Sequence, residues 1–229
     1  MRSADQQLIR ELSLFREMKQ ENFDALLSAA YFQRFPEGVT LIHEGDLPDF
    51  LHIVVEGMVE LFGSCGERQT TLDVIRPVTT FILAAVIRDD VYLKSARTLA
   101  PSQILMIPAT AVREVFDRDA AFARAVVGEL ADRYRCVVRE LKNQKLRTGL
   151  ERLAAWILQA ERQQGGDGRV RLTYDKRTLA SQLGMTAENL SRNLAALAQH
   201  GVASRGREII IGNRDALETC ARPDALIDA

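Results

Sequence analysis

The residues best suited to chemistry lie near the C-terminus, in the segment Glu188-Asn-Leu-Ser-Arg192. Arg192 can donate two hydrogen bonds to the O6 and N7 atoms of guanine, and Glu188 can accept one from the amine of cytosine. Ser191 can contact several base edges. A solvated Glu–Arg pair on a helix surface is the alternative interpretation of the same residues. The neighbouring elements decide between these two interpretations.

Two short helices joined at a glycine are predicted around this segment. Asp175 can cap the first helix and Thr186 the second, because their side-chain oxygens can accept hydrogen bonds from free backbone N–H groups. Gly184 suits the turn, where a positive φ would strain other residues. The second helix would bury three residues: Leu190, Leu194 and Leu197. This pattern predicts a helix-turn-helix whose second helix enters the major groove with Glu188, Ser191 and Arg192.

Other polar residues nearby suit DNA phosphates, which position a protein without specifying sequence. We expect this role for Lys176, Arg177, Thr186, Asn189, Arg205 and Arg207. Residues 169–214 carry eight basic and three acidic side chains, although the whole chain has a formal net charge of −1. A hairpin predicted over residues 201–211, turned at Arg205-Gly206, would make this a winged helix-turn-helix.

The N-terminal half of the chain has a different pattern of apolar residues and glycines. Amphipathic helices are predicted over residues 4–29, and short β-rich runs separated by glycines follow from Phe32 to about Ile107. Such runs predict an antiparallel barrel or roll. Pro108 then opens a short helix, and the fold class expected for the chain is α+β.

A long helix is predicted from Asp119, with apolar residues at spacings of three and four. These residues are Val127, Leu130, Tyr134, Val137 and Leu141. The pattern favours a two-helix seam and a two-fold homodimer, with packing against the protein's own barrel as the alternative. We therefore expect a sensor domain at 1–118, a dimerisation helix at 119–146 and a DNA-binding domain at 147–229.

Composition argues against several classes of protein. No run of about 20 apolar residues and no signal peptide is present, so the cytoplasm is expected, with no membrane contact. Cys65, Cys136 and Cys220 form no C-x-x-C pair, which disfavours a zinc site or a disulfide framework. No catalytic motif is recognised, and no metal site or enzyme activity is expected. A cupin-like metal enzyme is a remote alternative, with only three histidines to supply ligands.

At this point the chain resembles the CRP/FNR family of bacterial transcription regulators. Residues 38–46 and 50–57 are similar to that family's cyclic-nucleotide-binding roll, and the resemblance covers nearly the whole length. Ser191 stands where CRP-type members carry glycine, and Ala187 where they carry arginine, so the recognition helix resembles the FNR type. Asn193 departs from the pattern, which has an apolar residue there. The resemblance implies a homodimeric activator that binds inverted TTGA-like half-sites and contacts RNA polymerase.

The sensing half departs further from that family. Phe81 is followed by Ile82-Leu83 where cyclic-nucleotide binders carry Gly-Glu, and Lys94-Ser95 replaces Arg-Ser. The ribose then lacks a charged acceptor, and lysine cannot reproduce the arginine fork on a phosphate. Cyclic AMP is therefore not expected, although a cyclic-nucleotide-responsive regulator of CRP type stays as an alternative. The cysteine cluster that holds the iron–sulfur centre of FNR itself is absent.

The effector is left open by the sequence. A candidate pocket comprises Phe81, Ile82, Leu83, Val86, Lys94 and Ser95, extended by Ile87 and Leu93; ordinary core is the alternative. Residues 81–90 resemble a subgroup that includes nitric-oxide-responsive regulators of denitrification. Haem is thus one candidate cofactor, with His43, His52 or His200 as axial ligand. His52 equally suits core or surface, and His200 suits the C-terminus of a helix.

Overall fold

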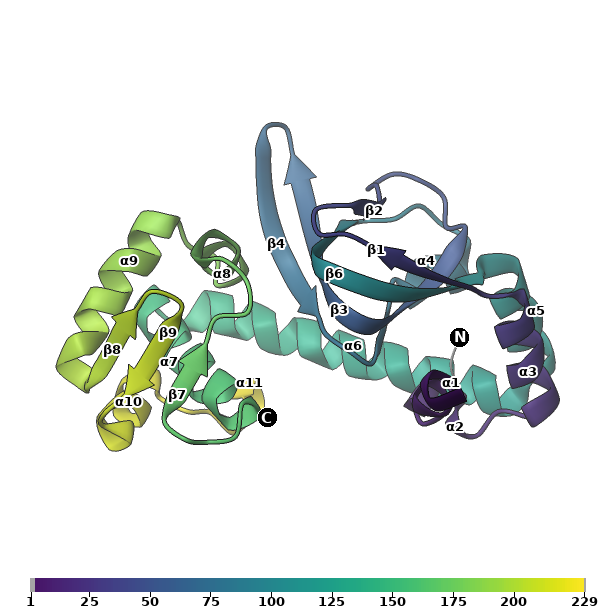
Figure 1. Cartoon of the computed structure of the whole chain (residues 1–229). Helices are drawn as coiled ribbons and strands as arrows, with labels where there is room; N and C mark the ends of the chain where they lie inside the picture. The colour runs from purple at the N-terminus through teal and green to yellow at the C-terminus, as the bar shows by residue number, and fades with distance from the viewer. Residues whose placement is uncertain (1–2, 229) are drawn as a thin grey trace. The chain divides into compact units, whose positions relative to one another are not determined.

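The computed structural model describes residues 3–228 (Figure 1). The chain divides into two compact units, with the boundary between Tyr134 and Arg135. The longest helix, α6 (Ala120–Leu146), belongs to both units, because the boundary falls within it. The α+β class expected from the sequence is confirmed.

The first unit is a six-stranded antiparallel sheet with helices before it, after it and between its last two strands. The strands are β1 (Tyr31–Phe35), β2 (Thr40–Ile42), β3 (Phe50–Cys65), β4 (Arg68–Ile75), β5 (Thr79–Phe81) and β6 (Ser95–Pro108). Their order is β1-β6-β3-β4, with β2 also paired to β6 and β5 to β3. The helices of this unit before α6 are α1 (Ser3–Arg10), α2 (Ser13–Arg16), α3 (Gln20–Ala29), α4 (Leu83–Arg88) and α5 (Ala109–Arg118).

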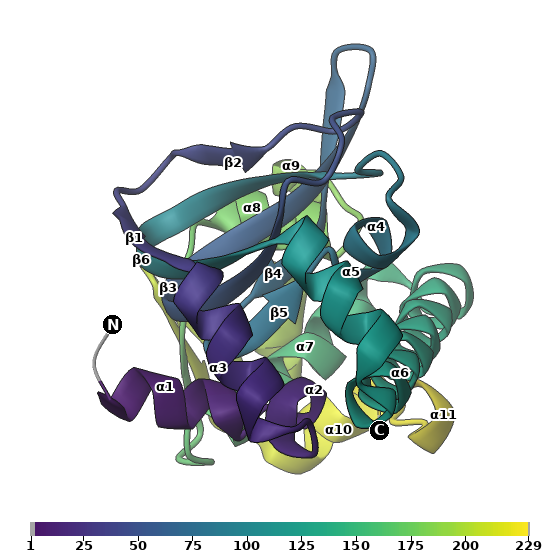
Figure 2. The ribbon, with the colours of Figure 1, turned by 90° about the vertical axis from the view of Figure 1, so that its right-hand side faces the viewer.

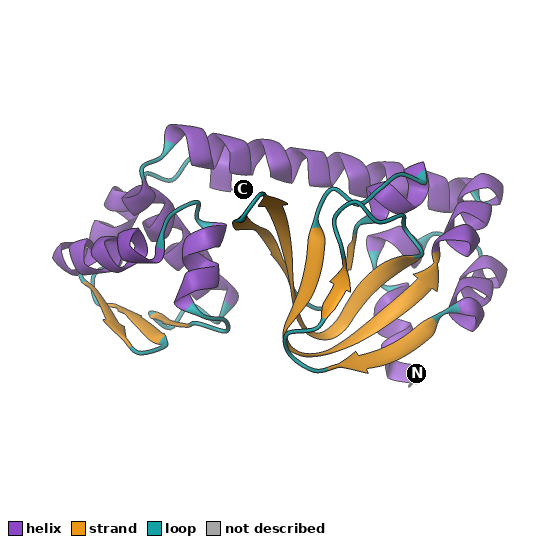
Figure 3. Cartoon of the chain, turned by 90° about the horizontal axis from the view of Figure 1, so that it is seen from above, coloured by secondary structure: helices purple, strands orange, loops and turns teal. Residues whose placement is uncertain are grey.

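The two longest strands curl the sheet into a roll, as Figure 3 shows. The pairing of β3 with β6 shifts register between Val54 and Val59, and such irregularities bend and twist strands. Gly57 lies within this stretch at φ +92°, and a Cβ there would lie 2.3 Å from Ser102 Oγ. The bend therefore depends on a residue without a side chain.

Strand β3 supplies both cores of the unit, because alternate residues of a strand face opposite sides. Ile53 joins the core that the helices cover, where Phe15 packs against Phe23 and Phe122 with ring centroids 5.9 and 6.0 Å apart. Val54 joins the other core, inside the roll. Figure 2 shows α3 and α5 side by side on the helical side of the sheet.

A single carboxylate caps two helices of this unit. Asp119 Oδ1 accepts hydrogen bonds from the N–H groups of Ala121 and Phe122 at 3.0 and 3.1 Å, at the start of α6. Asp119 Oδ2 accepts from the N–H of Lys19 at 2.9 Å and from Asn22 Nδ2 at 2.8 Å, at the start of α3. These four bonds lower the pKa of Asp119 to about 2 against the opposing effect of burial.

The predicted seam of α6 divides between two environments. Val127, Tyr134, Val137 and Leu141 are 56–70% exposed. Leu130 is partly buried against the helical core, following Phe122 and Val126 at intervals of four residues. Leu130 therefore contributes to the interior of its own unit, which the spacing alone did not distinguish from the seam.

The second unit contains the C-terminal part of α6 and the remaining elements. These are α7 (Gly149–Gln163), β7 (Arg169–Arg171), α8 (Lys176–Gln182), α9 (Ala187–Ala196), the 3₁₀ helix η1 (Leu197–His200), β8 (Val202–Arg205), β9 (Glu208–Ile211), α10 (Arg214–Ala221) and α11 (Ala225–Asp228). The small sheet has the order β7-β9-β8. Arg205 pairs with Glu208, so the hairpin turns at Gly206-Arg207, one residue beyond the predicted Arg205-Gly206.

Candidate nucleic-acid interface

The pair α8–α9 is a helix-turn-helix built on local signals. The carboxylate of Asp175 accepts a hydrogen bond from the N–H of Thr178 at 2.7 Å, and the hydroxyl of Thr186 accepts from the N–H of Asn189 at 3.2 Å. Gly184 takes the turn with φ +64°. The inner side of α9 and η1 is formed by Leu190, Leu194 and Leu197, all at most 8% exposed. The two predicted caps and the glycine turn are confirmed.

The outer side of α9 presents Glu188, Ser191 and Arg192, all exposed. The guanidinium of Arg192 donates a hydrogen bond to Asn189 Oδ1, a contact that the sequence interpretation missed. The pKa of Glu188 is lowered by its own backbone N–H, by the Thr186 hydroxyl and by the charge of Arg192. Glu188 is therefore an ionised acceptor at neutral pH, beside a guanidinium donor.

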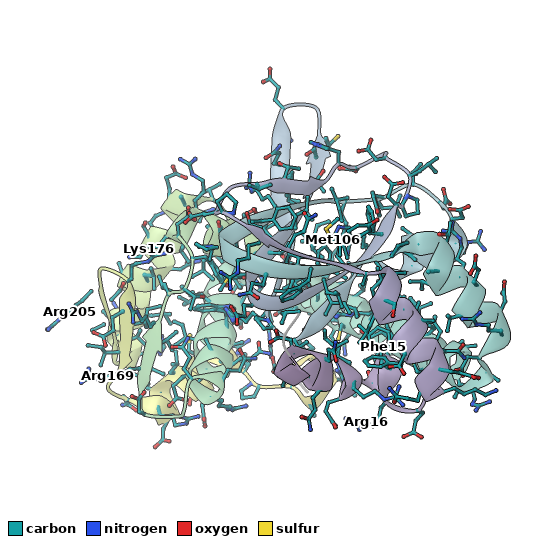
Figure 4. The ribbon with its side chains drawn as sticks, turned by 45° about the vertical axis from the view of Figure 1, so that its right-hand side comes forward. Phe15, Arg16, Met106, Arg169, Lys176 and Arg205 are labelled. Atoms are coloured by element: carbon teal, nitrogen blue, oxygen red, sulfur yellow. The ribbon has the colours of Figure 1, made fainter. Side chains whose placement is uncertain are left out.

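Basic side chains border this face. Lys176, Arg177, Arg205 and Arg207 are exposed, and Figure 4 shows Arg205 extending outward from the hairpin. Lys176 Nζ lies 3.4 Å from Ser204 Oγ, to which it donates, so the start of α8 is joined to β8. A groove of about 400 Å³ runs between α9 and β8, lined by Lys176, Ser191, Leu194, Ala195, Ala198, Val202, Ala203 and Ser204. One base-reading candidate and one phosphate candidate thus share a groove.

The proposed effector residues of the first unit are packed side chains. Phe81 and Ile82 belong to the core inside the roll, whereas Leu83 and Val86 belong to the core under the helices. None of the four is more than 9% exposed. Leu93, which the sequence places at the edge of this candidate pocket, is 82% exposed and lies outside both cores. The chain turns between the two cores at Ile82, which has a left-handed backbone.

Ser95 already has a partner within the protein, and Lys94 lies partly buried near other charged side chains. Ser95 Oγ accepts a hydrogen bond from the N–H of Glu44 at 2.9 Å. Burial lowers the pKa of Lys94, while the charge of Asp73 opposes that effect and the charge of Arg133 adds to it. A small polar hollow of about 240 Å³ lies between α2, β5 and α6, and Arg133 lines it.

The three histidines differ in exposure. His52 on β3 is 3% exposed, with its ring 5.2 Å from that of Phe81 and Nδ1 3.1 Å from the carbonyl oxygen of Phe50. Burial lowers the pKa of His52 to about 4, so the ring is neutral at pH 7. His43 is exposed and His200 ends η1. His52 faces packed side chains, and the 240 Å³ hollow has no histidine in its lining. These residues do not fit a haem.

Metal ligands do not gather elsewhere in the described part of the chain. Within residues 3–228, no group of three or more His, Cys, Asp and Glu side chains could hold a metal ion. In the same range, no helix has the length and apolar character needed to cross a membrane. The cupin-like alternative therefore finds no ligand cluster among these residues.

Comparison with known families matches both parts of the chain. Residues 151–220 match the Crp-like helix-turn-helix domain, and residues 32–119 match the cyclic nucleotide-binding domain. The chain belongs to the CRP/FNR family of transcription regulators. Within a CRP/FNR regulator, α8 and α9 form the DNA-binding motif, and the roll is the counterpart of the nucleotide-binding domain.

Individual relatives cover most of this CRP/FNR chain. The cyclic AMP receptor protein of Thermus thermophilus is 29% identical over 84% of this chain and 88% of its own. FixK2 of Bradyrhizobium japonicum has the same fold, with a TM-score of 0.74, 20% identity and coverage of 86% of this chain and 99% of its own. DNR of Pseudomonas aeruginosa matches with a TM-score of 0.53, 23% identity and coverage of 96% and 99%.

Proposed function

We propose that this regulator is a homodimeric activator that binds an inverted repeat of TTGA-like half-sites. The observation that carries the proposal is the exposed set Glu188, Ser191 and Arg192 on a capped helix whose opposite side is buried. Arg192 would donate to guanine, and Glu188 would accept from cytosine on the opposite strand. RNA polymerase is the partner expected of an activator.

Phosphate contacts would place this helix in the groove. Lys176 and Arg177 lie in the first turn of α8, and Arg205 and Arg207 lie at the hairpin. The two sets border α9 on the sides of α8 and β8. They would add affinity that depends on salt and not on sequence.

The exposed side chains Val127, Tyr134, Val137 and Leu141 support dimerisation through α6. Large apolar side chains repeated along one exposed helix face are typical of a helix–helix interface. Two copies related by a two-fold axis would present two α9 helices to the two half-sites.

The effector in this proposal is a molecule other than cyclic AMP, and nitric oxide is one candidate. Ala84 and Ala85 follow Leu83, so no carboxylate is available in this turn for a ribose, and Ser95 is engaged with Glu44. The cyclic AMP receptor protein among the relatives keeps the cyclic-nucleotide alternative in place. A rise in melting temperature on adding cyclic AMP would favour that alternative. Melting temperature measured with and without nitric oxide, with no haem added, tests the other candidate.

The DNA-binding proposal is tested with Arg192→Met in a binding titration against the TTGA repeat and a scrambled duplex. Wild type should prefer the repeat, and the variant should lose most of that preference, because one bidentate contact discriminates by about 1–3 kcal/mol. Sedimentation should show an unchanged dimer. Arg162→Met, at an exposed arginine of α7, is the matched control. Equal affinity of wild type for both duplexes would refute the proposed site.

A further inference from the structure

Arg152, in the first turn of α7, makes hydrogen bonds in two directions. The residue is only 9% exposed. Its Nε donates to the carbonyl oxygen of Leu183 at 2.9 Å, with a longer contact from Nη2 to Gly184 at 3.4 Å. Its Nη1 donates to the carbonyl oxygen of Arg147 at 2.7 Å, with a longer contact to Gln144 at 3.5 Å. One guanidinium therefore joins the turn of the helix-turn-helix to the end of α6.

The acceptors explain why an arginine suits this place. The last carbonyl groups of a helix lack partners within it, and a cation at a helix C-terminus is favourable. The Arg152 guanidinium donates hydrogen bonds to the carbonyl groups of Leu183 and Gly184 at the end of α8. It also donates to those of Gln144 and Arg147 at the end of α6. The planar fork of arginine can donate to both groups at once, whereas an ammonium is a compact point donor.

Close packing reinforces the same junction. A Cβ at Gly184 would lie 2.3 Å from Gln144 Oε1, so the turn sits directly against the last turns of α6. A Cβ at Gly149, the first residue of α7, would lie 3.0 Å from Asn193 Nδ2 of α9. Asn193 Nδ2 also lies 3.5 Å from Met185 Sδ. Asn193, the departure from the family pattern, thus packs where α9 meets the start of α7.

We infer that Arg152 is a positioning residue that fixes the reading helix relative to the end of α6. The inference rests on the proposed dimer and its inverted repeat. If α6 pairs with its copy, a reading helix fixed to α6 has a fixed distance and rotation from its partner. Arg152 would then determine which half-site spacing the dimer accepts, while Arg192 determines which bases it accepts. Arg152 acts through the carbonyls of the turn and belongs to no base-reading face.

The test uses the full-length protein and three duplexes that keep both half-sites but differ by one base pair in spacing. One base pair moves a half-site by about 3.4 Å and about 35°. Wild type should bind the preferred spacing at least about tenfold more tightly than either neighbour, a factor that corresponds to about 1.4 kcal/mol. Arg152→Met should reduce that ratio to within about threefold, and should retain its preference for TTGA half-sites over scrambled ones.

Two further variants separate positioning from general destabilisation. Arg152→Lys keeps the charge but cannot bridge both groups of carbonyls, so it should also lose spacing preference. If Arg152→Met does not melt cooperatively, the spacing preference of Arg152→Lys tests the inference in its place. Arg162→Met should keep wild-type spacing preference. Folded Arg152 variants with wild-type spacing preference would overturn the inference alone. A wild type without preference for TTGA half-sites would instead overturn the proposed function on which the inference rests.

Discussion

The guanidinium of Arg192 donates a hydrogen bond to Asn189 Oδ1, one turn earlier on α9. A long side chain that is already held in place loses less conformational freedom when it meets a base. Asn189→Ala should therefore weaken binding to the TTGA repeat by about threefold to tenfold, since ordering one such side chain costs about 0.5–1.5 kcal/mol. A competition titration measures this loss.

Two comparisons make that prediction specific. Gln199→Ala removes an exposed amide from η1 and should leave affinity unchanged. If Asn189 acts through Arg192, and not as the phosphate contact expected from the sequence, the double variant Asn189→Ala/Arg192→Met should bind no more weakly than Arg192→Met alone. Fully additive losses would show that Asn189 acts on DNA by itself.

The Thr186 cap at the start of α9 should contribute measurably to the free energy of unfolding. Thr186→Ala removes the acceptor for the N–H of Asn189 and should lower the free energy of unfolding by about 1 kcal/mol. Thr186→Ser keeps the hydroxyl and should cost much less. The chain has one tryptophan, Trp156 on α7, so its fluorescence during urea denaturation reports on the second unit. Equal loss in both variants would argue against the cap.

The exposed face of α6 predicts a change in oligomeric state. Val137 is 64% exposed, and Val137→Glu would place a charge in the proposed seam. Sedimentation velocity should then show a monomer at concentrations where wild type is a dimer, with helical content by circular dichroism unchanged. Cys136→Glu, at the adjacent exposed position off the seam, should stay dimeric. A monomeric wild type would rule out the seam.

The double cap at Asp119 predicts a pH dependence. The pKa of this carboxyl is lowered from 3.8 to about 2 in the folded chain, so its contribution is fully present above pH 3.8 and is lost as the pH falls through about 2. The shift corresponds to about 2 kcal/mol of folding stability. Urea denaturation followed by circular dichroism should show Asp119→Asn less stable than wild type at pH 6, with the difference shrinking toward pH 2. A constant difference across this range would exclude the linkage.

The sequence was sufficient to predict those helices, strands and turns whose determinants lie within a few residues of one another. Asp175, Gly184 and Thr186 each act within a few residues along the chain, so their types and spacing predicted the helix-turn-helix. The alternation of glycines and short β-rich runs predicted the roll for the same reason. The family resemblance rested on these local features, and the matches over residues 32–119 and 151–220 agree with it.

Tertiary structure decided which side chains meet across the chain. Asp119 accepts from Asn22, 97 residues earlier, and Arg152 reaches Leu183, 31 residues later. Phe81 and Val86 were grouped by sequence, yet the chain reverses between them and places them in different cores. Periodicity identifies an apolar face but does not identify the surface that covers it. The sequence by itself therefore determined the elements and the candidate base-reading residues, whereas the folded chain determined how α9 and the turn before it are anchored to the end of α6.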